Sequence, residues 1–184
     1  MAASDPHQHP HPPAPGSSSC LSAPALIERL DEEINRAERL GTPLSCLLVV
    51  IGNADELSYA HGSAFVEEAL TFIASALAGE LRRFDRIGRP GEEELMLVLP
   101  GADAPRGEIA ARRVLGRLRA IKIESEGVRR PLRMVVGLAT WMKDVSADEL
   151  LAEARAAVQR EHLAGASMRL TGSPPAPLGR DVPS

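Results

Sequence analysis

The alternation of apolar and polar residues predicts a helix, a strand and a second helix in the first half of the chain. Between residues 24 and 40 apolar side chains recur at every third or fourth position, the spacing of an amphipathic helix, and Gly41 ends it. Residues 44–51 form a nearly continuous apolar run with β-branched side chains, which is typical of a strand buried on both faces. The helical spacing returns over residues 62–81.

The second half continues this alternation. Residues 85–90 and 94–99 predict a β-hairpin with Pro90 and Gly91 at its turn. A helix, a strand and a helix are then expected at residues 109–121, 133–141 and 147–159. This order predicts an α/β (α+β) domain, in which helices flank a central mixed, mostly antiparallel sheet of about five strands.

The two ends of the chain differ in composition from the part between them. Residues 1–21 are rich in Pro, His and Ser, and residues 171–184 are rich in Pro. Such segments offer too little apolar surface to offset the entropy lost on ordering. We therefore expect two disordered tails around one domain at residues 22–170.

Overall composition limits the class of protein. The chain has 184 residues, 44% of them hydrophobic, which suffices for one packed domain but not for two. An aromatic content of 3% argues against binding of single-stranded nucleic acid by stacking, and a net charge of −4 argues against nucleic-acid binding in general. The first residues show no basic region followed by an apolar one, so no secretory signal is expected, and the longest apolar run, residues 46–51, is too short to span a bilayer. We expect a cytoplasmic protein with neither nucleic acid nor membrane as a partner.

The predicted hairpin carries the first candidate chemistry. Its turn holds one glycine followed by three carboxylates, Glu92, Glu93 and Glu94. Carboxylates at such a turn can hold a Mg²⁺ ion beside a nucleotide phosphate. Taken alone, however, the segment is more often a solvated acidic turn, because such turns favour polar residues.

Three segments together resemble the GGDEF domain, the diguanylate cyclase family. The segment RPGEEEL at residues 89–95 is similar to the family signature R-x-G-G-(D/E)-E-F, ARRVL at 111–115 to its A-x-R-(L/V)-R helix, and VVGLA at 135–139 to its S-I-G-x-A strand. The signature positions are Gly91, Glu92, Glu93, Glu94 and Leu95. The resemblance covers residues 22–170 and implies the GGDEF, nucleotidyl-cyclase-like fold.

The resemblance implies an enzyme that makes cyclic di-GMP from two GTP molecules with bound metal ions, and several aligned positions depart from it. The metal-binding Asp of the first strand falls on Val50, which has no ligand atom, and the second signature glycine falls on Glu92. Two phosphate-binding cations fall on His162 and Ala166. These departures predict a degenerate homologue that is not an enzyme, has no metal site and requires no cofactor.

Other aligned positions favour the alternative of a residual diguanylate cyclase, for which Mg²⁺ is the cofactor. Glu93 and Glu94 keep the two signature acids, which the family uses to bind metal and to activate the 3′-hydroxyl. The guanine-binding Asn and Asp of the family fall on Ser58 and Glu67, which are weaker substitutes but can still form hydrogen bonds.

A second site of the family, which binds its product, is also matched. That site has the motif R-x-x-D before the signature and a further Arg on the following helix, which correspond to Arg82, Asp85 and Arg113. An Arg fork can bind guanine O6 and N7, and an Asp carboxylate can accept from the guanine N1–H and amino group. The more ordinary interpretation of Arg82 and Asp85 is an ion pair between residues i and i+3 at a helix end.

These residues predict a signalling protein that acts as a receptor for cyclic di-GMP, a bacterial second messenger. The expected partners are cyclic di-GMP, an unidentified protein effector and a second copy of the chain in a homodimer. A module that binds proteins without any nucleotide is the remaining alternative, and it predicts that neither GTP nor cyclic di-GMP raises the melting temperature.

Overall fold

The computed structural model describes residues 20–121, 123–125, 128–129, 131–164 and 168–169. The tails expected at residues 1–21 and 171–184 lie outside this part of the chain, except for Cys20 and Leu21. Leu21 extends the edge of the sheet, since its N–H donates to the Ile87 carbonyl at 2.9 Å. Within the described residues no helix has both the length and the hydrophobicity needed to cross a bilayer.

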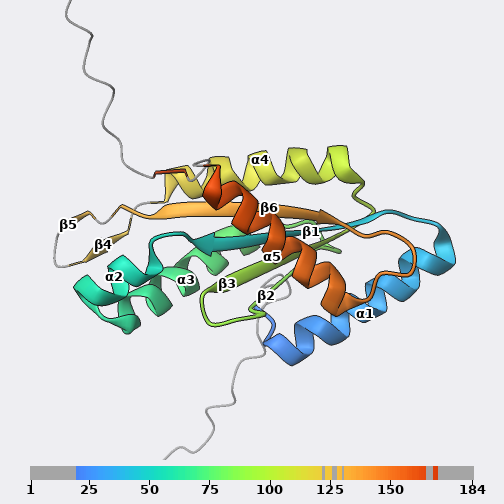
Figure 1. Ribbon diagram of the computed structural model, residues 1–184, viewed down its shortest axis with the longest axis horizontal. Helices are drawn as coiled ribbons and strands as arrows, with labels where there is room; N and C mark the ends of the chain where they lie inside the picture. The colour runs from blue at the N-terminus through green and yellow to red at the C-terminus, as the bar shows by residue number, and fades with distance from the viewer. Residues whose placement is uncertain (1–19, 122, 126–127, 130, 165–167, 170–184) are drawn as a thin grey trace, which may run out of the picture.

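The described chain alternates helices and strands (Figure 1). The helices are α1 (Ala23–Leu40), α2 (Ala54–His61), α3 (Ser63–Ala78), α4 (Ala104–Ala120) and α5 (Ala147–Leu163). The strands of the main sheet are β1 (Leu44–Ile51), β2 (Arg86–Gly88), β3 (Glu94–Pro100), β6 (Arg133–Thr140) and β7 (Met168–Arg169). A separate small hairpin joins β4 (Glu124–Ser125) and β5 (Val128–Arg129).

The main sheet has the strand order β2-β3-β1-β6-β7, and neighbouring strands in it are antiparallel. Its centre is β1, which pairs with β3 on one side and β6 on the other. The register places Val50 opposite both Glu94 and Val135. This arrangement confirms the predicted antiparallel sheet and fixes the signature hairpin against the end of β1.

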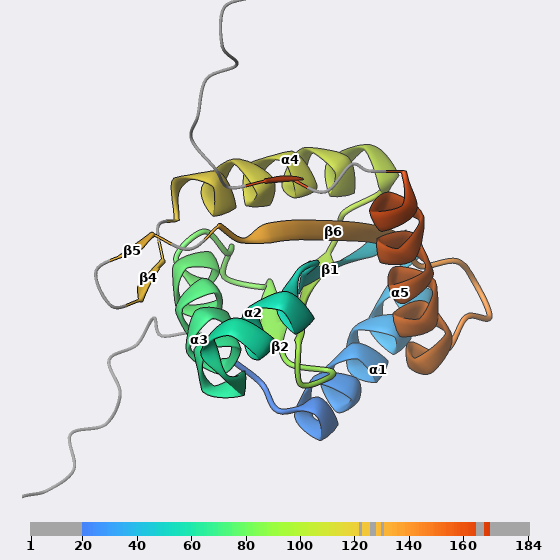
Figure 2. The ribbon, with the colours of Figure 1, turned by 60° about the vertical axis from the view of Figure 1, so that its left-hand side comes forward.

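Helices cover both faces of the sheet (Figures 1 and 2). On one face Leu47 and Val49 of β1 pack into a core with α2, α3 and α4. On the other face Cys46 and Leu48 pack with α1 and α5. Successive side chains of a strand point to opposite faces, so a strand between two helical layers is apolar except where a buried polar group finds a partner, as the Ser45 hydroxyl does at the Ala102 carbonyl. This explains the continuous apolar run of β1.

The strands expected at 44–51, 94–99 and 133–141 are confirmed as β1, β3 and β6, with ends that agree within one residue. Helix α4, in contrast, begins at Ala104 rather than at residue 109. Asp103 caps it, because its Oδ1 accepts from the Arg106 main-chain N–H at 3.0 Å.

The apolar spacing does not predict helix α2 or the short strands β4, β5 and β7. Helix α2 buries only Ala54 and Leu57, which is too few apolar positions to produce a recognisable stripe. The β4–β5 hairpin has strands of two residues each, too short for a period-2 pattern. The helix expected over 62–81 begins at Ser63 but ends earlier, at Ala78.

We predict that Gly137→Ala destabilises the fold. A Cβ on Gly137 of β6 would lie 2.6 Å from the Val158 main-chain nitrogen and 2.7 Å from the Ala154 carbonyl oxygen, so α5 would have to move. The expected loss in free energy of unfolding is about 1–3 kcal/mol, the usual cost of overpacking. Denaturant unfolding of the purified protein measures it.

Gly116→Ala is the matched control, because a Cβ on Gly116 in α4 would meet nothing within 4 Å. It should raise the free energy of unfolding by up to about 1 kcal/mol, since alanine favours the helix over glycine. Equal stability of Gly137→Ala and the wild type would contradict the close packing of α5 on β6.

Candidate functional site

The turn between β2 and β3 carries the signature residues and is bound to α3. The Arg89 guanidinium forms a bidentate ion pair with the Glu67 carboxylate, with 2.7 Å between Nη2 and Oε2. The same guanidinium donates to the Glu92 carbonyl within the turn. The hydrogen bond between the two side chains lowers the pKa of Glu67 and raises the pKa of Arg89. Arg89 therefore links the signature turn to α3.

Glu94, the last carboxylate of the signature, is bound from the other face of the sheet. Arg155 of α5 donates to it twice, from Nε to Oε1 at 2.8 Å and from Nη2 to Oε2 at 2.7 Å. This contact raises the pKa of Arg155. A Cβ on Gly91 would lie 2.6 Å from the Glu94 Oε2 atom, so only glycine leaves room for this side-chain position. Glu94 is thus held against α5.

A cleft of about 660 Å³, which we call the signature cleft, separates the turn from α2 and α3. Its volume lies within the range typical of small-molecule sites. It is lined by Ala23, Ser58, Ser63, Ala64, Val66, Glu67, Arg89, Gly91, Glu92 and Glu93. Ser58 and Glu67, which align with the guanine-binding residues of the family, are thus brought beside Glu93, whereas Glu94 does not line the cleft.

The described side chains do not form a ready metal site at this place. Val50 has no ligand atom, and both oxygens of Glu94 are bonded to Arg155. In the part of the chain that the structure describes, no cluster of three or more His, Cys, Asp or Glu side chains is placed to hold a metal ion. Glu92 and Glu93 are therefore the signature carboxylates that line the cleft, and neither belongs to a cluster of three or more possible ligands among the described residues.

The turn between β1 and α2 depends on Asn53, for which the sequence indicated no role. The Asn53 Oδ1 accepts from the Arg133 N–H at 2.9 Å, and its Nδ2 donates to the Pro131 carbonyl at 3.2 Å. His162, aligned with a phosphate-binding Lys, lies beside this turn, since a Cβ on Gly52 would be 3.3 Å from its Nδ1. A polar residue between a strand and a helix is the only sequence signal that marks Asn53.

A second cavity lies at the far end of β3, and we call it the arginine cavity. Its volume is about 130 Å³, and it is lined by Arg82, Asp85, Leu99, Pro100, Ala102, Arg106, Ile109, Ala110 and Arg113. Arg82 and Asp85 come from the segment before β2, and Arg113 comes from α4. The fold thus brings the three sequence-predicted ligand residues to one place, and it adds Arg106.

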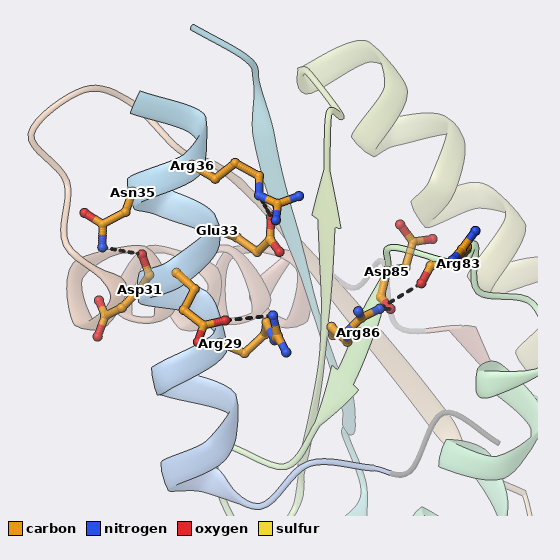
Figure 3. A network of polar contacts seen from close by, with 9 residues as sticks. Arg29, Asp31, Glu33, Asn35, Arg36, Arg83, Asp85 and Arg86 are labelled. Atoms are coloured by element: carbon orange, nitrogen blue, oxygen red, sulfur yellow. Dashed lines mark hydrogen bonds and ion pairs between the residues drawn. The ribbon is translucent and has the colours of Figure 1, made fainter. Parts of the chain in front are cut away.

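Asp85 is the buried polar group of this cavity, with only 4% of its surface exposed. Its Oδ2 accepts from the Arg82 main-chain N–H at 2.9 Å. Figure 3 shows its carboxylate turned toward α4. The segment lies beyond the end of α3, so the ion pair at a helix end that was the more ordinary interpretation does not form.

The arginines around this cavity differ in their contacts. Arg86 donates to the carbonyls of Arg83 and Asp85 at 2.9 and 2.7 Å (Figure 3). The Arg83 guanidinium lies 5.8 Å from the centre of the Phe84 ring. The guanidinium groups of Arg82 and Arg113, in contrast, form no ion pair with any other described residue.

Comparison with known proteins identifies the class. The family model described as "Diguanylate cyclase, GGDEF domain" matches residues 24–168, and the chain belongs to this family. It is 26% identical over 141 residues to diguanylate cyclase DgcP of Pseudomonas aeruginosa, covering 77% of this chain and 21% of that protein. It is 28% identical over 119 residues to diguanylate cyclase DosC of Escherichia coli K12, covering 64% of this chain and 25% of that protein. The chain thus spans a quarter or less of the length of these relatives.

Solved structures confirm the fold. Diguanylate cyclase SiaD of Pseudomonas aeruginosa, in complex with its activator SiaC, superposes with a TM-score of 0.75 at 24% identity, covering 80% of this chain and 57% of that chain. The GGDEF domain of DgcB from Caulobacter crescentus, in complex with c-di-GMP, gives 0.72 at 16% identity, with 80% and 86% covered. The FimX GGDEF domain from Pseudomonas aeruginosa gives 0.73 at 15% identity, with 80% and 92% covered.

These matches overturn one sequence-based prediction. The prediction that the domain is not an enzyme is wrong, because the chain matches the diguanylate cyclase family model and its relatives are named diguanylate cyclases. That prediction assumed that catalysis requires the family's residue at each aligned position, such as those of Val50 and Glu92. A missing ligand atom at one aligned position describes that position and does not exclude the reaction for the domain.

We predict that Glu67 titrates below the ordinary value of 4.5 and returns toward it in Arg89→Ala. Because the folded-state pKa is lowered, the ion pair stabilises the fold above about pH 4.5 and is lost as the pH falls through the folded-state pKa. Glu67 is 57% exposed, so this contribution should stay below about 1 kcal/mol. NMR titration of the carboxyl carbons measures the pKa.

Arg112→Ala serves as the control, since Arg112 pairs with Glu108 on the exposed face of α4. It should leave the Glu67 titration unchanged. An equal pKa of Glu67 in the wild type and in Arg89→Ala would show that the two side chains do not pair in solution.

Proposed function

We propose that this GGDEF domain is a signalling domain that binds cyclic di-GMP in the arginine cavity. The observation that carries the proposal is the convergence of Arg82, Asp85 and Arg113 from two separate segments on one cavity. Two of these residues are arginines whose guanidinium groups have no carboxylate partner among the described residues.

The charge of the cavity suits a doubly anionic ligand. Three guanidinium groups and one carboxylate line it, which gives a net charge of +2. Cyclic di-GMP carries two phosphodiester groups, each with one negative charge. Unpaired guanidinium groups bind phosphate oxygens through charge-assisted hydrogen bonds, which are among the stronger contacts in proteins.

Asp85 suits the guanine base. Its carboxylate is buried, and one of its oxygens already accepts from the main chain of Arg82. An ionised carboxylate accepts several hydrogen bonds, and the N1–H and amino group of guanine are adjacent donors. Asp85 is therefore the group we assign to distinguish guanine from adenine, which has no N1–H.

The size of the cavity indicates how the ligand lies. A hollow of about 130 Å³ is smaller than the roughly 300–1,000 Å³ of pockets that enclose a whole ligand. Only one part of the dinucleotide enters it, and the rest lies over the adjoining surface. Ile109 on that surface is 62% exposed and offers apolar contact area. The complex of the DgcB GGDEF domain with c-di-GMP supports the proposal by similarity of fold.

We predict that calorimetric titration with cyclic di-GMP shows saturable binding to the wild type. Arg82→Ala and Arg113→Ala should each weaken the affinity at least about tenfold, because each removes charge-assisted hydrogen bonds. Arg83→Ala is the matched control, since Arg83 adjoins Arg82 in the sequence but does not line the cavity. It should bind as the wild type does.

Absence of heat with the wild type at micromolar concentrations would refute the receptor function. Unchanged affinity in Arg82→Ala would refute the assignment of the site. If neither cyclic di-GMP nor GTP raises the melting temperature, the domain acts as a protein-interaction module without nucleotide, because a ligand of the native state must stabilise it.

A second candidate function is the formation of cyclic di-GMP from GTP at the signature cleft. It is favoured by the placement of Ser58, Glu67 and Glu93 around one cleft of about 660 Å³, large enough for a nucleotide, and by the named cyclases among the relatives. In this reaction each 3′-hydroxyl attacks the α-phosphorus of the other nucleotide, so two GTP yield one cyclic di-GMP, two pyrophosphates and two protons.

We predict for this candidate that incubation with GTP and Mg²⁺ or Mn²⁺ yields cyclic di-GMP, detected by chromatography. Glu93→Gln should strongly reduce the yield, because Glu93 lines the cleft and matches one of the two signature acids that the family uses in the reaction. Glu108→Gln, on the exposed face of α4, should not change it. Failure to form product with either metal would exclude this function and leave the binding of cyclic di-GMP to be judged by calorimetry.

A further inference from the structure

The arginine cavity contains one cationic residue that the R-x-x-D motif does not include. Arg106 lies seven positions before Arg113 on α4. Seven residues are nearly two helical turns, or about 10 Å along the axis, so both side chains leave the same face of the helix. Ile109 and Ala110, which also line the cavity, lie between them on that face. The α4 wall of the cavity is therefore an apolar stripe with an arginine at each end.

The contacts of Arg106 hold it in place and leave most of its donors unused. Its Nη1 donates to the Gly101 carbonyl at 3.3 Å, and its main-chain N–H is capped by Asp103 at 3.0 Å. A guanidinium has five N–H donors, of which only one is engaged here by a described residue. No ion pair joins Arg106 to any carboxylate in the described part of the chain.

The position of Arg106 in its helix indicates which ligand group it binds. It lies in the first turn of α4, where the helix dipole favours negative charge. The opposite part of the cavity holds Arg82 with the buried Asp85, whose carboxylate suits a base and repels a phosphate. The phosphate-binding part of the cavity is thus the side formed by α4.

We propose that Arg106 is a further ligand-binding residue, which binds one phosphate of the cyclic dinucleotide while Arg113 binds the other. Arg82 and Asp85 then contact a guanine base. This inference rests on the proposed binding of cyclic di-GMP in the arginine cavity and deepens it. In this arrangement Arg106 and Arg113 of α4 select a ligand that carries two separate phosphates.

The experiment is calorimetric titration of the whole protein with cyclic di-GMP. Arg106→Ala should weaken the affinity roughly ten- to hundredfold, and Arg106→Lys, which keeps the charge but not the fork, should restore part of the loss. The dissociation constant of Arg106→Ala should also depend less on salt concentration than that of the wild type, because one ionic contact fewer is screened. A purely structural effect of the substitution would not reduce this salt dependence.

Arg112→Ala is the matched control on the same helix, because Arg112 pairs with Glu108 and does not line the cavity. It should bind as the wild type does, and melting temperatures without ligand should show that all variants are folded. Binding by Arg106→Ala equal to the wild type, while Arg82→Ala has lost affinity, would overturn the role of Arg106 and leave the proposed function intact. Absence of binding by the wild type would overturn both.

Discussion

The burial of β1 on both faces is the constraint on which the other positions in this domain depend. Its side chains alternate between the core with α2, α3 and α4 and the core with α1 and α5. A shift of one residue in its pairing would exchange these two sets of side chains, so both faces fix the same register. Because β3 and β6 pair with β1 in that register, the signature turn, Val50 and the start of β6 meet at one end of the sheet.

The two ends of strand β3 lie at two sites that differ in whether their charged side chains have partners. Near its start two acidic groups are paired within the protein, Glu67 with Arg89 and Glu94 with Arg155. At its end, about 20 Å away by the rise of a seven-residue strand, Arg82 and Arg113 stand together without carboxylate partners among the described residues. Guanidinium groups held close together repel one another, and an anion that binds between them relieves this repulsion. The two ends of one strand therefore differ in which charged groups are paired within the protein.

The ion pairs at the signature turn also show what a comparison of single residues leaves out. Glu94 keeps the acid of the family signature, yet its two oxygens are bonded to Arg155. Glu67 stands where the family recognises guanine, and it is bonded to Arg89. An aligned side chain has a chemical identity, but its partners decide which atoms remain for a substrate. The prediction of a domain without enzymatic activity considered only the identity of aligned residues such as Val50, and the family match and the named cyclases overturn it.

The amino-acid sequence by itself determined the class of fold, the family and most of the elements. The two-sided burial of β1 requires an apolar run, the hairpin requires a turn at Gly91, and these patterns are local. Tertiary structure alone decided what lies together. It joined Arg106 of α4 to the residues of the R-x-x-D motif, and it bonded Arg155 of α5 to Glu94. The physical reason is that pattern and propensity act within a few residues, whereas a cavity or an ion pair between distant segments exists only once the sheet has fixed where each helix packs.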